Sequence, residues 1–318
     1  MRRRSTFYGL AACALVVPAL VVLAMVVEAR AADSATYTRQ EDVIYGRKDG
    51  MALTLDVITP KQGANGAAVI SVMSGGFFSS HDWINPAAAR VFLERGYTVF
   101  AVVHGSQPRY TIPDAVADLN RATRFIRYKA KDFHVDPDRI GITGGSAGGH
   151  LSLMQGVAGD RGNPLALDPV ERTSSRVQAV ACFFPPTDVL NYGKQGNVDL
   201  GTGILKNFRA PFEFRELDPK TRCYVQITDQ KRVLEIARSI SPAYHVTKDD
   251  PPTLIIHGDA DTLVPIQQAE LIMEKFKKAG VVAELVVKPK AGHGWPTLGA
   301  DMKLIVDWFD KHLAKPAK

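Results

Sequence analysis

The chain carries Gly144-Gly145-Ser146-Ala147-Gly148, which matches the pattern G-x-S-x-G. Residues 139–143 before it predict a short strand, and residues 149–154 after it predict the start of a helix. A serine on a tight turn from strand to helix takes a strained backbone, and its hydroxyl is then exposed above the sheet. Small residues two places before and after the serine let the chain approach itself closely. The stretch therefore predicts a nucleophilic serine in a βα fold.

Length and composition predict one folded α/β domain over residues 32–318. The whole chain has 318 residues, of which 46% are hydrophobic and 23% are charged, so it can bury a large core. The formal net charge is +6, and part of it comes from Arg2-Arg3-Arg4. The other basic residues are scattered and form no stripe, so we expect no nucleic-acid partner.

Strand and helix signals alternate from residue 42 onward. Residues 43–45 and 53–58 predict an antiparallel hairpin. Later strands are predicted at 68–73, 97–103, 139–143, 177–184, 253–257 and 283–287, and helices at 86–95, 113–131, 149–154, 267–279 and 301–313. Such repeated βα units predict a mostly parallel central sheet with helices on both faces. Reactive groups should gather at the carboxyl ends of its strands.

Residues 188–241 interrupt this alternation. They are richer in charged residues and glycine than their surroundings and open with residues 191–196, Asn-Tyr-Gly-Lys-Gln-Gly. We interpret them as a lid-like insertion over the catalytic face. The alternative is a surface excursion that touches no substrate.

A serine nucleophile needs a base and a carboxylate that orients the base, and in this architecture both follow the serine in the chain. Asp259 and Asp261 both lie in the acidic turn after the strand at 253–257. We choose Asp261 because it lies further along the turn, whereas Asp259 is better placed to shape it. His293 is the predicted base because it lies late in the chain, in a loop after a strand, between two glycines.

The other histidines are given lesser roles. His150 lies just past the serine and is expected to pack on the helix face. His81, His104 and His257 are expected to make local hydrogen bonds. Because His104 ends a parallel strand, it is also a candidate for the border of the pocket.

Acyl transfer also needs an oxyanion hole, whose donors point at the charge that develops in the tetrahedral intermediate. One predicted donor is the backbone N–H of Ala147, the residue after the nucleophile. The second should come from the loop at residues 73–78, where Gly76 and Phe77 are the best candidates. The alternative is that this loop is a plain glycine-rich turn.

Together these residues resemble the α/β-hydrolase superfamily, and within it the stand-alone serine esterases of the BD-FAE and hormone-sensitive-lipase-like groups. The similar segments are residues 136–141, 144–151, 241–244 and 251–261. The resemblance covers nearly all of residues 42–312 apart from the insertion. It implies a serine carboxylesterase with Ser146, Asp261 and His293 as its triad and with no metal or organic cofactor.

One departure from the family concerns the oxyanion loop. Where the family usually has His-Gly-Gly-Gly, this chain has Met73-Ser74-Gly75-Gly76. The family's histidine braces the loop and does not react. Its loss leaves the identity of the oxyanion donors open but does not change the expected reaction class.

We weigh three functions. The first is an exported carboxylesterase acting on small-molecule or carbohydrate-linked esters with short acyl or aryl groups, such as acetyl or feruloyl esters of polysaccharide. The second is a serine peptidase of the prolyl-oligopeptidase type, which usually carries a large propeller domain before the catalytic one; only about forty residues precede the hairpin here. The third is a silent binding protein, which usually lacks a triad residue.

Residues 1–31 predict a targeting segment. Arg2-Arg3-Arg4 forms a positive start, an apolar run follows over residues 7–27, and Ala29-Arg30-Ala31 fits a cleavage site. The apolar run is near the length that spans a bilayer, about 20 residues. An uncleaved membrane anchor is therefore the alternative to a signal peptide. Either one predicts export to the periplasm or beyond.

Two cysteines, Cys182 and Cys223, follow the targeting segment. In an oxidising compartment they could form a disulfide. The alternative is that Cys182, inside the apolar run 179–184, is a buried strand residue.

Overall fold

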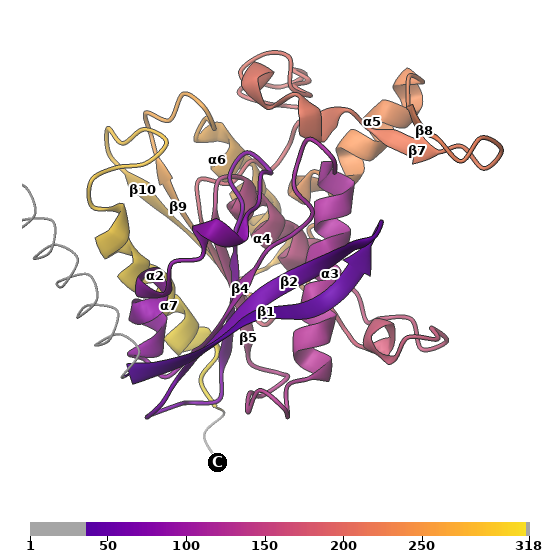
Figure 1. Cartoon of the computed structure of the whole chain (residues 1–318). Helices are drawn as coiled ribbons and strands as arrows, with labels where there is room; N and C mark the ends of the chain where they lie inside the picture. Colours follow the sequence, from indigo (N-terminus) through magenta and orange to yellow (C-terminus); the bar gives the residue numbers. More distant parts are fainter. Residues whose placement is uncertain (1–35, 316–318) are drawn as a thin grey trace, which may run out of the picture.

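The computed structural model describes residues 36–315, so the predicted targeting segment lies outside the described residues. Figure 1 shows a central sheet with helices on both faces. Eight strands form it in the order β1-β2-β4-β3-β5-β6-β9-β10. Their bounds are Tyr37–Lys48 (β1), Met51–Pro60 (β2), Ala68–Val72 (β3), Thr98–Val102 (β4), Ile140–Gly145 (β5), Ala179–Phe183 (β6), Thr253–Gly258 (β9) and Ala283–Lys288 (β10).

The sheet is mostly parallel, as predicted. The hairpin β1–β2 and the pair β2–β4 are antiparallel, and every later pairing in the sheet is parallel. The parallel strands β3, β4, β5, β6 and β9 are almost wholly buried, which agrees with the continuous apolar runs of their sequences. Their carboxyl ends meet at one edge of the sheet, where the loops after β3, β4, β5, β9 and β10 come together.

Two hydrophobic clusters hold the helices against the sheet. On one face, the core includes Leu119, Leu151 and Ile272 from α3, α4 and α6. On the other face, it includes Phe92 and Phe309 from α2 and α7. The helix bounds are Pro86–Leu93 (α2), Ile112–Tyr128 (α3), Ala147–Ala158 (α4), Gln267–Ala279 (α6) and Leu298–His312 (α7). The prediction of helices on both faces is therefore confirmed.

Some predicted boundaries were wrong. The first strand is β1, which is much longer than residues 43–45. It lies at the edge of the sheet with most of its side chains partly or fully exposed, so its sequence lacks a sustained apolar signal. Helix α3 ends at Tyr128 and not at residue 131. It begins at Ile112 because Thr111 forms a capping box with Asp114.

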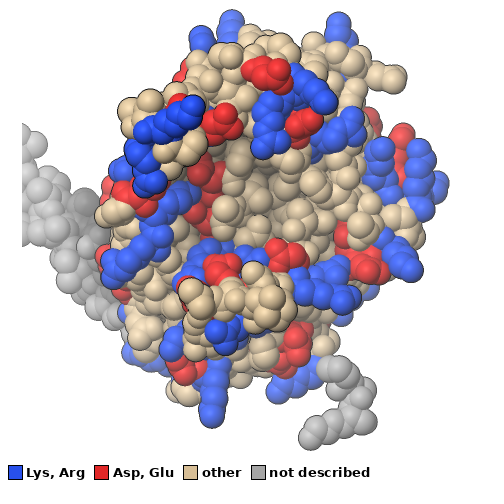
Figure 2. Space-filling model, turned by 90° about the vertical axis from the view of Figure 1, so that its right-hand side faces the viewer, with Lys and Arg blue, Asp and Glu red and all other residues tan. Residues whose placement is uncertain are grey.

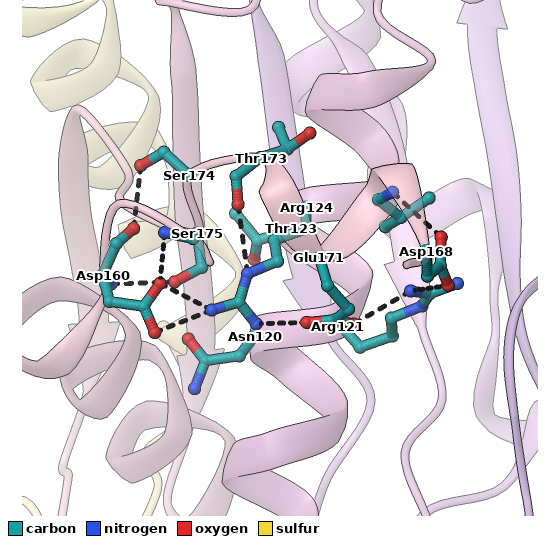
Figure 3. Close-up of polar contacts among 12 residues, drawn as sticks. Asn120, Arg121, Thr123, Arg124, Asp160, Asp168, Glu171, Thr173, Ser174 and Ser175 are labelled. Carbon is teal, nitrogen blue, oxygen red and sulfur yellow. Dashed lines mark hydrogen bonds and ion pairs between the residues drawn. The ribbon is translucent and has the colours of Figure 1, made fainter. Parts of the chain in front are cut away.

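The loop between α4 and β6 is fastened to α3 by ion pairs, shown in Figure 3. Arg124 contacts Asp160 at 2.6 Å, and Arg121 contacts Asp168 at 2.6 Å and Glu171 at 2.9 Å. Because α4 runs back along the sheet from Ser146, this loop lies at the amino ends of the parallel strands, away from the serine. These ion pairs therefore support the fold and not the serine site.

The insertion, residues 188–241, lies at the top of the view in Figure 1. It contains the short antiparallel strands β7 (Arg215–Leu217) and β8 (Tyr224–Gln226) and the helix α5 (Gln230–Ser239). Short 3₁₀ helices precede them at Lys206–Phe208 and Ala210–Phe212. The 3₁₀ helices reach the serine site, as described below.

The two cysteines are not joined. Cys182 is fully buried in β6, and Cys223 is exposed just before β8. Cys182 is therefore a buried strand residue and not half of a disulfide. Its burial raises the pKa of the thiol well above its usual range.

The described surface carries charges of both signs. On the face shown in Figure 2, Lys and Arg lie among Asp and Glu around a broad uncharged area. Within residues 36–315, no helix combines the length and apolar character that crossing a bilayer requires.

Candidate active site

Ser146 lies between β5 and α4 in a backbone conformation that is rare for a residue with a side chain. Its φ is 54° and its ψ is −120°. The glycines around it permit this turn: a Cβ on Gly144 would lie 2.5 Å from the backbone of Gly148, and a Cβ on Gly148 would lie 3.1 Å from the carbonyl oxygen of Val72. Strain of this kind costs about 1–3 kcal/mol and is typical of functional sites.

Three side chains from separate loops meet at this turn. His293 Nε2 lies 2.9 Å from Ser146 Oγ, and His293 Nδ1 lies 2.7 Å from Asp261 Oδ2. Because a carboxylate only accepts, Nδ1 carries the proton that binds Asp261, and Nε2 is free to accept the serine proton. The structure thus brings together the three residues that the sequence predicted to converge.

The turn after β9 also separates the two competing carboxylates. Asp259 accepts a hydrogen bond from the backbone N–H of Lys290 at 2.5 Å. Asp261 faces the imidazole and accepts from the N–H groups of Leu263 and Val264, both at 2.9 Å. Asp259 therefore shapes the turn, and Asp261 orients the histidine.

Asp261 is held ionised although its carboxylate is buried. Burial alone would raise its pKa, but the nearby His257 imidazole and the hydrogen bonds from His293 and the N–H of Val264 outweigh it and hold the pKa well below its usual range. A firmly ionised carboxylate is what the imidazolium formed during catalysis requires beside it.

Two further residues support the triad, and sequence reasoning missed the first of them. The ring of Phe184, just after β6, packs on the ring of His293 with 4.4 Å between centroids. Phe184 has a φ of 35°, and nothing in its apolar run signals this. His257 Nε2 donates to the carbonyl of Val264 at 2.7 Å and lies 3.5 Å from Asp261. This bond is the local hydrogen bond that the sequence predicted for His257.

The loop after β3 makes a tight turn beside Ser146. Gly75 and Phe78 exchange two backbone hydrogen bonds of 3.0 and 2.9 Å. The two central residues, Gly76 and Phe77, both have positive φ, of 54° and 63°. Within residues 36–315, neither of their N–H groups donates to another protein group. The turn therefore leaves both predicted oxyanion donors available.

A small apolar cavity joins these parts. It has a volume of about 30 Å³ and is bordered by Ser146, Ala147, Gly76 and Phe77. The insertion supplies much of its opposite wall, namely Leu205, Phe208 and Phe212. All three predicted oxyanion donors thus lie around one space next to the serine.

His150 also borders this cavity, which sequence reasoning did not anticipate. It is 1% exposed, and its burial lowers the pKa of the imidazole to about 4. Nδ1 donates to the carbonyl of Pro186 at 3.1 Å. The side chain is therefore neutral and packs beside the oxyanion loop, with its ring edge-on to Phe77.

A cation site is not part of this arrangement. In the described portion of the chain, the one group with suitable spacing is Glu41, Asp56 and His81. Asp56 is already paired with Arg39, and none of these residues borders the cavity at Ser146.

Comparisons with known proteins place the chain in a family. The family model described as BD-FAE matches residues 55–276. The chain is 28% identical over 272 residues to "Probable carboxylic ester hydrolase LipM" of Mycobacterium tuberculosis, a match that covers 83% of this chain and 58% of that protein. The chain thus spans under two thirds of that relative's length.

Solved structures share the fold over nearly their whole length. "Truncated form of carbohydrate esterase from gut microbiota" is 28% identical with a TM-score of 0.67, and the match covers 88% of this chain and 98% of that one. A butyrate-bound esterase of Thermogutta terrifontis is 25% identical with a TM-score of 0.66, covering 87% and 96%.

Proposed function

Because this chain belongs to the BD-FAE family of α/β-hydrolases, we propose that it is a serine carboxylesterase that acts on short acyl esters. The observation that carries the proposal is the continuous hydrogen-bonded line from Ser146 through His293 to Asp261. The similarity to a carboxylic ester hydrolase and to a carbohydrate esterase supports the same reaction class.

The geometry supports acyl transfer in two steps. Ser146 Oγ attacks the ester carbonyl carbon while His293 Nε2 takes its proton, and His293 then gives that proton to the departing alcohol. A water molecule repeats the sequence on the acyl-enzyme and releases the carboxylic acid. Asp261 stabilises the imidazolium in both steps.

The oxyanion of each tetrahedral intermediate needs donors at the cavity wall. We assign the N–H of Ala147 and those of Gly76 and Phe77 to this role, because all three residues surround the cavity beside Ser146. One such donor contributes about 3 kcal/mol to lowering the barrier.

The size of the cavity favours a short acyl group. The cavity is narrow and apolar, and Leu205, Phe208 and Phe212 close in on it, so it favours an acetyl group over a bulky feruloyl group. One of the similar solved structures is named a carbohydrate esterase. Together with the narrow cavity, this similarity supports acetyl groups on carbohydrate as the natural target. We further propose that the insertion acts as a partial lid, since its residues Leu205, Phe208 and Phe212 line the same space.

The experiment that tests this function compares p-nitrophenyl esters from acetate to octanoate with proline-linked peptide amides. We expect kcat/KM to be highest for acetate and to fall steadily with chain length. Faster cleavage of the peptide amides than of every ester would overturn the proposal in favour of a peptidase.

Phe208 is expected to set the acyl limit. The Phe208 ring lies so close to Gly76 that a Cβ added to Gly76 would be 2.5 Å from the ring. The ring therefore closes the cavity over the oxyanion loop. Phe208→Ala should raise the butyrate-to-acetate ratio of kcat/KM about tenfold, since two accommodated methylenes contribute about 0.8 kcal/mol each. Tyr224→Ala, which removes an exposed ring from the same insertion, is the matched control. An unchanged ratio in Phe208→Ala would contradict the assignment.

Export stays a proposal that rests on residues 1–31. We propose that the catalytic domain lies in the periplasm or outside the cell, released by cleavage after Ala31 or held by residues 7–27. Mass spectrometry of the protein recovered from a fractionated host should give a mature N-terminus at Ala32, or an intact chain in the membrane fraction. Recovery of the intact chain in the soluble cytosolic fraction would contradict export.

A further inference from the structure

His104 lies two residues after the end of β4, next to the loop that follows β3. It is 3% exposed. Its Nδ1 donates to the carbonyl of Gly105 at 2.9 Å, and its Nε2 lies 2.8 Å from the hydroxyl of Ser74. Burial lowers the pKa of this imidazole to about 4. At neutral pH, Nε2 is therefore an acceptor, and Ser74 donates to it.

The same segment contacts the oxyanion loop at further points. The N–H of His104 donates to Ser79 Oγ at 3.1 Å, and the hydroxyl of Ser79 donates in turn to the carbonyl of Met73 at 2.6 Å. The N–H of Ser79 donates to Ser106 Oγ at 3.1 Å. Residues 104–106 therefore hold both ends of the loop, at Ser74 and at Ser79.

The centre of the loop is held as well. The N–H of Gln107 donates to the carbonyl of Phe77 at 3.1 Å. Phe77 has positive φ, a conformation that persists only where the surrounding contacts determine it. The bond to its carbonyl fixes the peptide plane that follows Phe77, and Ser74 fixes the start of the loop two residues before Gly76.

This arrangement answers the departure noted in the sequence. The loop itself has Met73 where the family has a bracing histidine, and no imidazole arises from within it. The imidazole that is hydrogen-bonded to the loop comes instead from the segment just after the neighbouring parallel strand β4, which pairs with β3 up to Val102. Ser74 carries the hydroxyl that this imidazole needs, in place of the family's glycine.

We propose that His104 is the positioning residue of the oxyanion loop and acts through Ser74 to aim the N–H groups of Gly76 and Phe77 at the reacting carbonyl. The inference rests on the proposed esterase function and deepens it. His104 does not border the cavity and does not touch the substrate. Its effect should therefore be specific to the stabilisation of the oxyanion.

The test is a double-mutant cycle on p-nitrophenyl acetate hydrolysis. We expect His104→Leu to lower kcat about thirtyfold and Ser74→Ala about tenfold, within the range for a weakened oxyanion donor, up to about 10³. KM should stay within about twofold, because ground-state binding does not use the oxyanion. The double variant should lose no more activity than His104→Leu alone, because the two substitutions remove the same hydrogen bond.

Rescue and inhibition separate positioning from a general structural role. His104→Gln keeps an acceptor near Nε2 and should restore kcat to within about threefold of the unsubstituted enzyme. The inhibition constant of a trifluoromethyl ketone, whose adduct carries an oxyanion, should rise in His104→Leu by the same factor as kcat falls. His245→Leu, which removes a half-buried histidine bound to the carbonyl of Ser239, should change neither quantity.

Several results would overturn the inference. They are an unchanged kcat in both Ser74→Ala and His104→Leu, losses that simply multiply in the double variant, or a loss in His104→Leu that glutamine does not restore. If His104→Leu does not fold, Ser74→Ala and His104→Gln still decide the question. A Ser146→Ala variant with full activity would instead refute the esterase mechanism itself, so the two failures are distinguishable.

Discussion

Replacing Ser146 by alanine is expected to lower kcat for p-nitrophenyl acetate by about 10⁶, the loss seen when the nucleophile of a serine hydrolase is removed. The reason is that no other hydroxyl is hydrogen-bonded to His293 in the described chain. The variant should still hydrolyse the ester faster than the uncatalysed reaction in water, because the oxyanion donors and the cavity are untouched. Steady-state kinetics with substrate at saturation measures this loss.

A matched control separates this effect from handling losses. Ser239→Ala removes another hydroxyl, one that is exposed on α5 and bonded to the carbonyl of Ile236. It should keep kcat within about twofold, as expected for a surface change. A Ser146→Ala protein that keeps more than a few per cent of the activity, after repurification, would contradict the assignment of the nucleophile.

The second large effect is expected from Asp261→Asn. Asparagine is close in shape to aspartate but cannot hold the imidazole in the tautomer that leaves Nε2 free to accept, so kcat should fall by about 10⁴. The loss should exceed that of removing one oxyanion contact, because it disables the base for every turnover. Kinetics near neutral pH, where the carboxylate is ionised in the native enzyme, measures it.

Asp259→Asn is the direct comparison, because both carboxylates lie in the same turn. Asp259 accepts only from the backbone of Lys290 among the described residues, so its replacement should change kcat by less than about threefold. A larger loss for Asp259→Asn than for Asp261→Asn would show that the wrong carboxylate had been chosen.

The sequence was sufficient to predict the fold class and the meeting of the triad residues. The elbow at Ser146 has a local signature, since only small residues permit its turn. Chain order then placed the acid and the base after late strands, where His293 was chosen as the base and Asp261 was preferred to Asp259 for its place further along the turn. The first inference depends on a pattern within a few residues and the second on the order of motifs along the chain, and a sequence displays both directly.

The remaining features depend on contacts between distant segments. The bond from Ser74 to His104 requires β3 and β4 to lie side by side, and the cavity wall at Phe208 requires the insertion to fold back over Gly76. The insertion contains α5, β7 and β8, but its path over the cavity depends on contacts with distant segments and could not be predicted. Phe184 has positive φ within an apolar run, and no residue type announces that conformation.

The central claim is that Ser146 is a nucleophile activated by His293. The most direct measurement treats the enzyme with a fluorophosphonate, which phosphonylates activated serines, and locates the adduct by peptide mass spectrometry. We predict one adduct per chain on the peptide that contains Ser146, loss of activity in proportion, and no adduct in Ser146→Ala or after acid denaturation. Full activity in an enzyme whose Ser146 is modified, or stoichiometric labelling of another residue with loss of activity, would contradict it.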